Sequence, residues 1–495
     1  MKSNRSNGKA TVSPATLTLM DEIFAATDLK LEAAAKNRLR DALGALPADL
    51  QDTAVGVLGA QAAAAAPIDG KVLKVVQAAI EAEKQALNAQ VNAVLHDPKF
   101  RDHKRRVLEV EKIVLNPKAK KVGFTLLNVS REALVEDMQS ADGDYTRTQF
   151  YTWACRRVFH EPGEVPYSVA FIGGRFGADD VPLAKSILST LAESHTLGVS
   201  QADPAIFTDF GTYRDLPDQP SQHGEKLQRD PALTEFRGLQ ADPARATQFV
   251  LATVGVLGRK PYHPSRNPAK GLGFFEEDAT DPDHWMFISP ATVAVNRVTE
   301  SLTSTGMPAA VVGVESGGKQ DVPVHVADGE AVVLERRVDE LDERAMAKLG
   351  FVLALPWKGD PSVTIYELNS LYVPPADLTG DELARAELAR KAALTLVRSK
   401  VGHRLKYLLR LTRGKVMTPK KVEALVESDL KERYCLGDPN VASQHELARR
   451  PLRSVKAAAE ELLPGEYKVT VTLFPHVAAS GFDVITEMAP SKGKG

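Results

Sequence analysis

The stretch GEYKVTVTLFP, residues 465–475, alternates strictly between apolar and polar side chains. Every second position holds a large apolar residue, namely Tyr467, Val469, Val471 and Leu473. Because successive side chains of a strand point to opposite faces, this period of two predicts a strand with one buried face. After a short turn, the next segment resumes the alternation with Phe482 and Val484. The chain is therefore expected to close with two strands.

Upstream of these strands the pattern is first helical and then mixed. From 379 to 413, apolar residues recur at spacings of three and four, which is typical of an amphipathic helix. Further upstream, strand-like and helix-like segments alternate. KKVGFTLLNVS at 120–130 and VPYSVAFIGGRFG at 165–177 are expected to be strands, and the second is expected to run into a tight glycine turn. Such alternation predicts a mixed α/β body.

The N-terminal part is expected to be helical after a polar arm. The apolar stripe that starts near Lys71 predicts one long helix ending near His96, and a further helix is expected over 100–115. The arm carries LTLMDEIFAAT at 17–27. Its apolar residues share one helix face and its acids lie in the first turn: Leu19, Met20, Asp21, Glu22, Ile23 and Phe24. A short amphipathic helix on an arm suits capture in a groove of another protein.

These patterns together predict an α/β (α+β) fold with a helical N-terminal region, a mixed α/β body and C-terminal β-strands. Five segments are expected along the chain: an arm at 1–30, a helical region at 31–118, the α/β body at 119–375, a helical part of the core at 376–462, and C-terminal strands with a tail at 463–495.

The composition is that of an ordinary folded protein. The chain has 495 residues, of which 43% are hydrophobic and 25% charged, and a formal net charge of −2. A near-balanced charge argues against a dedicated nucleic-acid binder. Two cysteines far apart in sequence favour a reducing compartment over a disulfide framework. The sequence shows no secretory signal, and its longest apolar run, near 249–258, is too short to cross a bilayer.

No motif in the chain predicts a catalytic, metal or cofactor site. GVESGGK at 313–319 has the outline of a phosphate-binding loop, but no Ser or Thr follows Lys319 and the next residues resemble a strand. IGGRFG at 172–177 lacks the glycine order of a dinucleotide-binding turn. The histidines and cysteines lack metal-ligand spacing, and G-x-S-x-G is absent. Both glycine loops are therefore interpreted as turns or surface loops.

One helical segment carries charge of a single sign. VRSKVGHRLKYLLRLTRGK at 397–415 contains several basic residues and no acid. A charged helix face is usually just solvated, but a one-sided sign also suits an oppositely charged partner surface. The candidate contact residues are Arg398, Arg404, Arg410 and Arg413.

Six segments can be compared, in order, with one known family. They are LLNVSREALVEDM at 126–138, EVPYSVAFIGGRFG at 164–177, RKPYHPSRNPAKGLGFFEE at 259–277, GVESGGKQDVPVH at 313–325, HRLKYLLR at 403–410 and RRPLRSVKAAAEELLPGEYKVTVTLFPH at 449–476. Together they resemble the large sheath subunit of the bacterial type VI secretion system, the TssC/VipB family. The family's usual tryptophan near residue 100 is missing, and Ser316 interrupts its glycine run.

The resemblance implies a structural, non-enzymatic protein of the bacterial cytoplasm. Such a chain pairs with a small, TssB/VipA-like sheath subunit and polymerises around an inner tube of Hcp-like protein on a baseplate, without nucleic acid and without direct membrane insertion. Its C-terminal strands complete an intermolecular sheet through Tyr467, Val469, Val471, Leu473, Phe482 and Val484. A ClpV-like disassembly ATPase grips the helix at 19–24. The basic helix is a candidate for a surface that faces the tube or a neighbouring protomer.

Two other classes of function stay open on the sequence. A sheath of another phage-tail-like contractile injection system would share the terminal strands but would not need the ATPase-recognition helix. An α/β enzyme would use the glycine loops near 173 and 313, and nucleotide binding that is lost in Lys319→Ala would support it. A plain binding module is the weaker third alternative, because the resemblance covers nearly the whole chain.

Overall fold

The computed structural model describes residues 70–161, 163–263, 276, 281–314, 318–327, 329–412, 415, 417–439, 442–463, 466–476 and 482–487. The chain divides into two compact units, one made of Met1–Phe100 and Pro261–Ala279 and the other of Arg101–Lys260 and Thr280–Gly495. The arm at 1–30, with its expected helix at 19–24, lies outside the described residues.

In the first unit, the described residues form mainly one long helix, α4 (Gly70–His96). It ends at the predicted place, because Pro98 opens the next helix, α5 (Pro98–Val114), and lacks the N–H that would continue α4. The carboxylate of Asp97 caps α5 by accepting the N–H of Phe100 at 2.9 Å. Both N-terminal helices that the sequence predicts over this range are confirmed.

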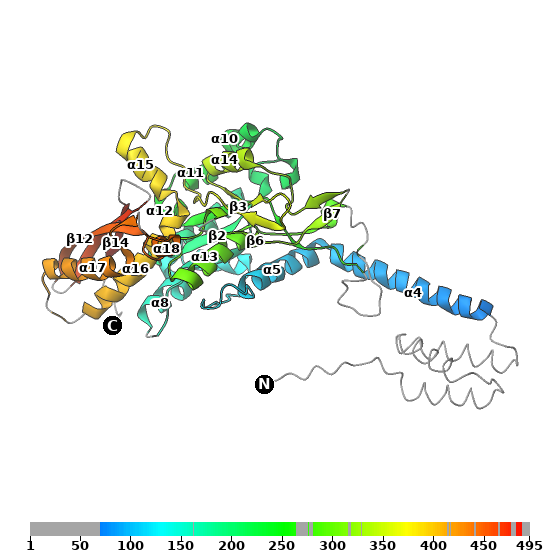
Figure 1. The fold of residues 1–495 in the computed structure, drawn as a ribbon, viewed down its shortest axis with the longest axis horizontal. Coiled ribbons are helices and arrows are strands. Elements are labelled where there is room, and N and C mark those ends of the chain that lie inside the picture. The colour runs from blue at the N-terminus through cyan, green and yellow to red at the C-terminus, as the bar shows by residue number, and fades with distance from the viewer. Residues whose placement is uncertain are drawn as a thin grey trace, which may run out of the picture. The chain divides into compact units, whose positions relative to one another are not determined.

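The second unit is built on a parallel four-stranded sheet of order β1-β2-β3-β9. Its strands are β1 (Val169–Phe176), β2 (Leu197–Ala202), β3 (Phe249–Thr253) and β9 (Val352–Leu353). Every residue of β2 and β3 is buried, as is typical of parallel strands covered on both faces. Helix α13 (Ala291–Thr305) contacts β1, β2 and β3, while α9 (Val181–Glu193) connects β1 to β2 (Figure 1).

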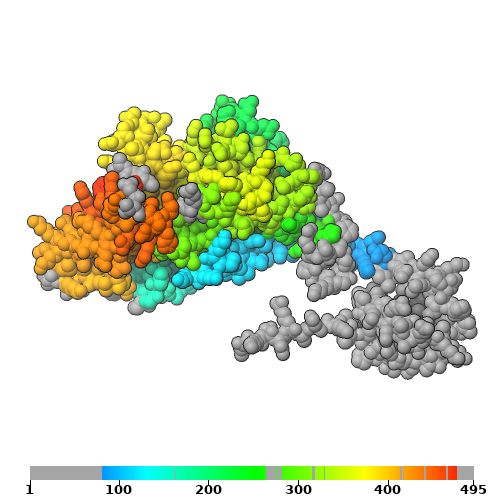
Figure 2. All heavy atoms as spheres, in the orientation of Figure 1, coloured from blue at the N-terminus to red at the C-terminus, as the bar shows by residue number. Residues whose placement is uncertain are grey.

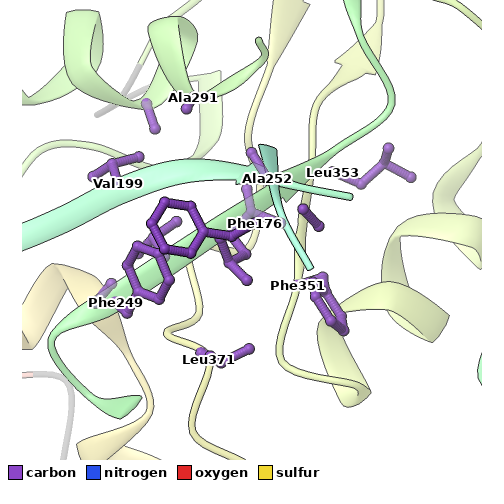
Figure 3. Packing of buried hydrophobic residues seen from close by; sticks show 14 of the residues in the cluster. Phe176, Val199, Phe249, Ala252, Ala291, Phe351, Leu353 and Leu371 are labelled. Atoms are coloured by element: carbon purple, nitrogen blue, oxygen red, sulfur yellow. The ribbon is translucent and has the colours of Figure 1, made fainter. Parts of the chain in front are cut away.

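Aromatic side chains fill the main core beside this sheet. The rings of Phe176 and Phe249 meet edge to face with their centroids 5.2 Å apart, and Phe351 meets Phe207 in the same way at 4.8 Å. Figure 3 shows Phe176 and Phe249 side by side next to the strands that carry Val199 and Ala252. Edge-to-face aromatic packing of this kind stabilises a core beyond the burial of its area.

Short helices and small sheets surround the main sheet. The helices are α6 (Arg131–Ser140), α7 (Gln149–Tyr151), α8 (Arg157–His160), α10 (Glu225–Arg229), α11 (Thr234–Gln240), α12 (Pro243–Ala246) and α14 (Glu340–Lys348). The strands are β4 (Val256–Arg259), β5 (Met286–Ile288), β6 (Gln320–Asp321), β7 (His325–Ala327), β8 (Glu330–Val332), β10 (Leu355–Pro356) and β11 (Ser362–Thr364).

Two expectations for the body are wrong. Residues 122–130 form no strand, and Leu126 is 73% exposed, because no strand among the described residues pairs with the segment. The glycines near 173 do not form a turn after β1 but lie inside it. Gly174 adopts a φ of 102°, which favours glycine, and the β1–β2 register shifts between Phe171 and Arg175.

The C-terminal part of the chain begins with four helices: α15 (Gly380–Ala389), α16 (Ala392–Thr412), α17 (Pro419–Tyr434) and α18 (Gln444–Arg449). Three strands follow: β12 (Leu452–Leu463), β13 (Glu466–Pro475) and β14 (Phe482–Glu487). Within this part, residues of α16, α17, β12 and β13 form a second core cluster. In the space-filling view, the orange residues of α16, α17 and β12 make up one continuous part of this unit's surface (Figure 2).

The segment 452–462 was expected within the helical part of the core and is a strand instead. Its sequence LRSVKAAAEEL is rich in good helix formers. Pairing with β13 outweighs that local preference, since Val455, Ala457 and Ala459 fall on the buried face and Lys456 and Ala458 on the exposed one. The chain as a whole is a mixed α/β protein, as predicted.

Candidate functional site

The C-terminal strands form one antiparallel sheet within the chain. β13 lies between β12 and β14, so that Val471 faces Ala457 on one side and Val484 on the other. The predicted apolar positions of β13 are buried: Tyr467, Val469, Val471 and Leu473. They pack against apolar residues of α16 and α17, and the alternation expected from the sequence is confirmed.

These apolar side chains are therefore used inside the chain. The hydroxyl of Tyr467 donates to the carbonyl of Met417, which fixes the strand against the segment before α17. Phe482 and Val484 lie in β14, in register with Leu473 and Val471. Within the part of the chain that the structure describes, no strand continues the sheet beyond β14. A link to another chain through this sheet would thus run through backbone groups at its edge.

The basic helix predicted as a partner surface is α16, and its arginines lie in different surroundings. Arg404 forms a forked ion pair with Asp429 of α17, at 2.9 Å from Nε to Oδ2 and 2.5 Å from Nη2 to Oδ1. Hydrogen bonds from Arg404 hold the pKa of Asp429 below its ordinary value. The guanidinium also lies 4.9 Å from the ring centroid of Tyr407. Arg404 therefore joins two helices of the same chain.

The other three arginines differ from one another. Arg398 is only partly exposed, and its Nη2 lies 3.5 Å from Oγ1 of Thr247. Arg410 is exposed on the last turns of the helix. Arg413 lies outside the described residues. Among the described members of the set, Arg410 is thus the one best placed to meet another molecule.

Two further basic side chains of α16 cap the end of α9. Nζ of Lys406 donates to the carbonyl of Glu193 at 2.7 Å, and Nε2 of His403 lies 2.9 Å from the carbonyl of Ser194. The last carbonyls of a helix have no partner within the helix, so donors from α16 satisfy them. Nothing in the local sequence pattern at 397–415 indicates a contact with residues near 194, so this joint could not be predicted.

The joint is tightly packed and buried. His195 follows α9 with a φ of 51°, and a Cβ at Gly402 would lie 2.8 Å from its ring. Burial lowers the pKa of His403 to about 4 and that of His195 well below its ordinary value. Both imidazoles are therefore neutral near pH 7. Gly402 is the residue that allows α16 to approach this closely.

The glycine loop at 313–319 differs from a phosphate-binding loop where it is described. Nζ of Lys319 pairs with Oδ2 of Asp360 at 2.8 Å and lies 3.7 Å from the ring centroid of Trp357. The strand β6 follows it, where a phosphate-binding loop would lead into a helix. The order β1-β2-β3-β9 also follows the chain without the reversal at which doubly wound sheets bind nucleotides.

Within the first unit, one of the compared segments holds a buried carboxylate. Oε2 of Glu276 accepts the N–H of Tyr262 at 3.0 Å, and the N–H of Glu276 donates to the carbonyl of Tyr262 at 3.0 Å. Oε1 of the same carboxylate lies 3.4 Å from Nε2 of His96 at the end of α4. Tyr262 and Glu276 are thereby held at the end of α4.

The described residues contain neither a metal-binding cluster nor a membrane-spanning helix. No group of three or more His, Cys, Asp or Glu in that part of the chain could hold a metal ion. No helix in the same ranges combines the length and apolar character of a membrane span.

Two protein-family models match the chain, one after the other. The VipB model, described as EvpB/VC_A0108, tail sheath N-terminal domain, matches residues 77–372. The VipB_2 model, described as EvpB/VC_A0108, tail sheath gpW/gp25-like domain, matches residues 381–490. Among curated protein sequences, none matches significantly.

Solved structures give more distant similarities. One is the cryo-EM structure of the anti-feeding prophage baseplate, at 9% identity and a TM-score of 0.33, covering 75% of this chain and 83% of that one. Another is the sheath tail protein Lin1278 from Listeria innocua, at 10% identity and a TM-score of 0.37, covering 74% of this chain and 61% of that one.

Proposed function

The chain belongs to the VipB family of tail sheath proteins, and on that premise we propose that it is the large subunit of a type VI secretion contractile sheath. It pairs with a small, TssB/VipA-like subunit, polymerises helically around an Hcp-like inner tube, and contracts on a baseplate to drive the tube into a target cell. The observation that carries the proposal is the match of both sheath domains in order, at 77–372 and 381–490. The protein acts in the bacterial cytoplasm as a structural subunit and catalyses no reaction.

The sheet β12-β13-β14 supplies the connection between protomers. A strand from the small subunit or a neighbouring protomer continues the ladder at the sheet's edge, where backbone hydrogen bonds provide the linkage. The apolar side chains of β13, held by α16 and α17, keep the receiving sheet rigid. Such a joint resists pulling while the bodies beside it rotate, so it holds the sheath together as the sheath shortens.

Contraction needs a difference in free energy between two packings of the lattice. A bistable interface switches between discrete arrangements because packed cores do not deform continuously. A difference of about 1 kcal/mol per protomer is small beside the stability of one domain, but it sums over a long polymer. The polymer, rather than any single site, performs the work.

The segment at 19–24, which the sequence predicts to be a helix, serves in recycling. Its apolar face, with Leu19, Ile23 and Phe24, enters a groove of a ClpV-like disassembly ATPase after contraction. A sheath from another phage-tail-like injection system would not need this helix. Loss of recycling in Ile23→Asp, with assembly unchanged, therefore separates the two kinds of sheath.

The proposal is tested by purifying the tagged full chain from its native cells and examining it by negative-stain electron microscopy and mass spectrometry. Hollow, ridged tubes that contain this chain and one abundant smaller protein are expected. A monodisperse particle without a stoichiometric smaller protein would overturn the proposal.

A further inference from the structure

The outer edge of β12 is occupied by two carboxylates. The N–H of Ala457 donates to Oε1 of Glu427 at 2.9 Å, and the N–H of Ala459 donates to Oε1 of Glu423 at 2.9 Å. Both glutamates lie on α17, which runs alongside β12 (Figure 1). The outward N–H groups of an edge strand are normally free to donate to the carbonyls of another strand. Here the side chains of a helix supply the acceptors.

The spacing of the two elements explains why a helix can do this. Two residues along a strand advance about 6.6 Å, and four residues along a helix advance about 6 Å. Glutamates four residues apart therefore reach N–H groups two residues apart. The order is antiparallel, since the later glutamate meets the earlier alanine.

Packing and charge hold α17 in this position. Its buried residues, spaced four apart, face the second core cluster: Val422, Val426 and Leu430. Nζ of Lys431 bonds Oε2 of Glu427 at 2.7 Å, which leaves Oε1 to Ala457. The hydrogen bond from Lys431 lowers the pKa of Glu427, and the hydrogen bond from the N–H of Ala457 lowers it further. The carboxylate thus stays ionised and acts only as an acceptor.

Without these acceptors, β12 of one chain could pair with β12 of a second copy of the chain. In an antiparallel pair of two copies centred on Ala458, Ala457 of one copy would lie opposite Ala459 of the other, and their outward N–H groups would find carbonyls. In the same register Lys456 would lie opposite Glu460, so opposite charges would meet twice. All three central side chains, Lys456, Ala458 and Glu460, are exposed. The sequence of β12 is therefore self-complementary.

We infer that Glu423 and Glu427 form an edge guard, which takes the place of a neighbouring strand and prevents β12 from pairing with β12 of a second copy of this chain. Because these two N–H groups of β12 are occupied, we expect a strand from another protein to extend the sheet on the β14 side. That consequence, unlike the guard itself, rests on the proposed function.

The guard is tested by trapping the self-paired state in the full chain expressed without partners. Ala458→Cys places one thiol at the centre of the self-paired register, where Cα atoms of facing, non-hydrogen-bonded residues lie about 4.5 Å apart, within disulfide reach. Mild oxidation with copper phenanthroline is expected to give a covalent dimer in Glu423→Ala/Glu427→Ala/Ala458→Cys. The same treatment of Ala458→Cys alone is expected to leave a monomer.

Two matched variants control the experiment. Glu423→Gln/Glu427→Gln keeps both acceptor oxygens and should leave Ala458→Cys monomeric, whereas Glu432→Ala removes an exposed glutamate from the same helix and should also have no effect. Hydrogen exchange of the Ala457 and Ala459 amides should accelerate about tenfold or more in Glu423→Ala/Glu427→Ala, while the circular dichroism spectrum stays native.

The absence of the cross-link in the triple variant would overturn the guard, and so would unchanged exchange at the two amides. Neither readout involves the small subunit or the tube. A failure of the wild-type chain to form tubes in its native cells would therefore count against the proposed function and leave the guard standing.

Discussion

Arg404 and Arg410 carry the same charge on the same helix but do different work. Arg404 is forked onto Asp429, whereas Arg410 is exposed. We expect Arg404→Ala to lower the free energy of unfolding by about 1–3 kcal/mol, because it leaves a partly buried carboxylate short of its main partner. Arg410→Ala should change it by less than about 0.5 kcal/mol. Urea denaturation of both variants measures the difference, and equal losses would contradict it.

The same comparison refines the hypothesis of a basic partner surface. If α16 faces an acidic tube or neighbour, Arg410→Glu should impair co-assembly with the small subunit and tube while leaving the monomer's stability unchanged. Arg404→Glu cannot answer this question, since it would also break the α16–α17 ion pair. Normal tubes from Arg410→Glu would remove the described part of the basic helix from the list of contact surfaces.

His403 makes stability depend on pH at the joint between α9 and α16. Its pKa is about 4 in the folded chain, below the ordinary 6.5, because burial disfavours the charged ring and Lys406 and Lys400 add repulsion. Between pH 6.5 and 4 the unfolded chain therefore binds the proton first, so stability is full above pH 6.5 and falls as the pH is lowered to 4. The shift corresponds to roughly 3 kcal/mol.

Replacing the imidazole tests this linkage. His403→Gln keeps a donor for the carbonyl of Ser194 but does not titrate, so the slope of the unfolding free energy between pH 6.5 and 4 should become shallower. His195 is also buried and neutral, and its own contribution should remain in the variant. Thermal or urea unfolding across this pH range measures the slope, and an unchanged slope would show that His403 is not a source of the pH dependence.

At the scale of elements, a substitution in β14 can remove a hydrogen bond of the proposed link between chains and leave the sheet of this chain intact. Because the N–H of Ala457 points away from β13, the N–H of its partner Val471 points toward β14. Val471 and Val484 are therefore a hydrogen-bonded pair, and the N–H of Val484 points toward β13. Because N–H groups alternate along a strand, the N–H of Ile485 points away from the sheet. Ile485→Pro therefore removes one outward donor and leaves the β13–β14 ladder intact.

We expect Ile485→Pro to fold with a thermal midpoint close to that of the wild type and to fail in forming tubes with the small subunit. Ile485→Val keeps the N–H and should assemble normally. Tubes of normal length from the proline variant, seen by electron microscopy, would show that strand addition does not use the β14 edge.

The elements also show what the sequence could and could not predict. The alternation at 467–473 predicted β13 because one face of that strand is buried in its own chain. The alanine-rich β12 was missed because its local preference is helical and only its pairing with β13 makes it a strand. Leu126 and its neighbours resembled a strand, but no strand in the part of the chain that the structure describes pairs with them. In both cases strand pairing decided the structure, and the local pattern of a segment does not encode its pairing.

The candidate assembly residues follow the same rule. Tyr467 and Val471 were found by their period, although the structure uses their side chains inside the chain. Glu423 and Glu427 were overlooked, because two glutamates four residues apart look like any solvated helix face. Their position beside the buried Val422 and Val426 was the available signal, and its meaning needed the edge of β12 to be known.

At the scale of the whole molecule, we expect the stability of the folded body to be independent of residues 1–69. The two large clusters of buried residues that the structure describes consist of residues from Leu108 onward. We expect a chain that lacks residues 1–69 to unfold cooperatively, with a thermal midpoint within about 4 °C of that of the full chain. Differential scanning calorimetry of the two chains measures this.

The same truncation separates assembly from recycling. If the helix at 19–24 is the site gripped by the disassembly ATPase, contracted sheaths lacking residues 1–69 should resist disassembly by a ClpV-like enzyme and ATP. Ile23→Asp in the full chain should have the same effect, because it places a charge on the apolar face that enters the groove. Disassembly is followed by light scattering, with Thr27→Ala, a change outside the set of recognition residues, as the matched control. Rapid disassembly of the Ile23→Asp sheath would assign the recognition to another segment, and the chain would then fit an injection system that fires without recycling.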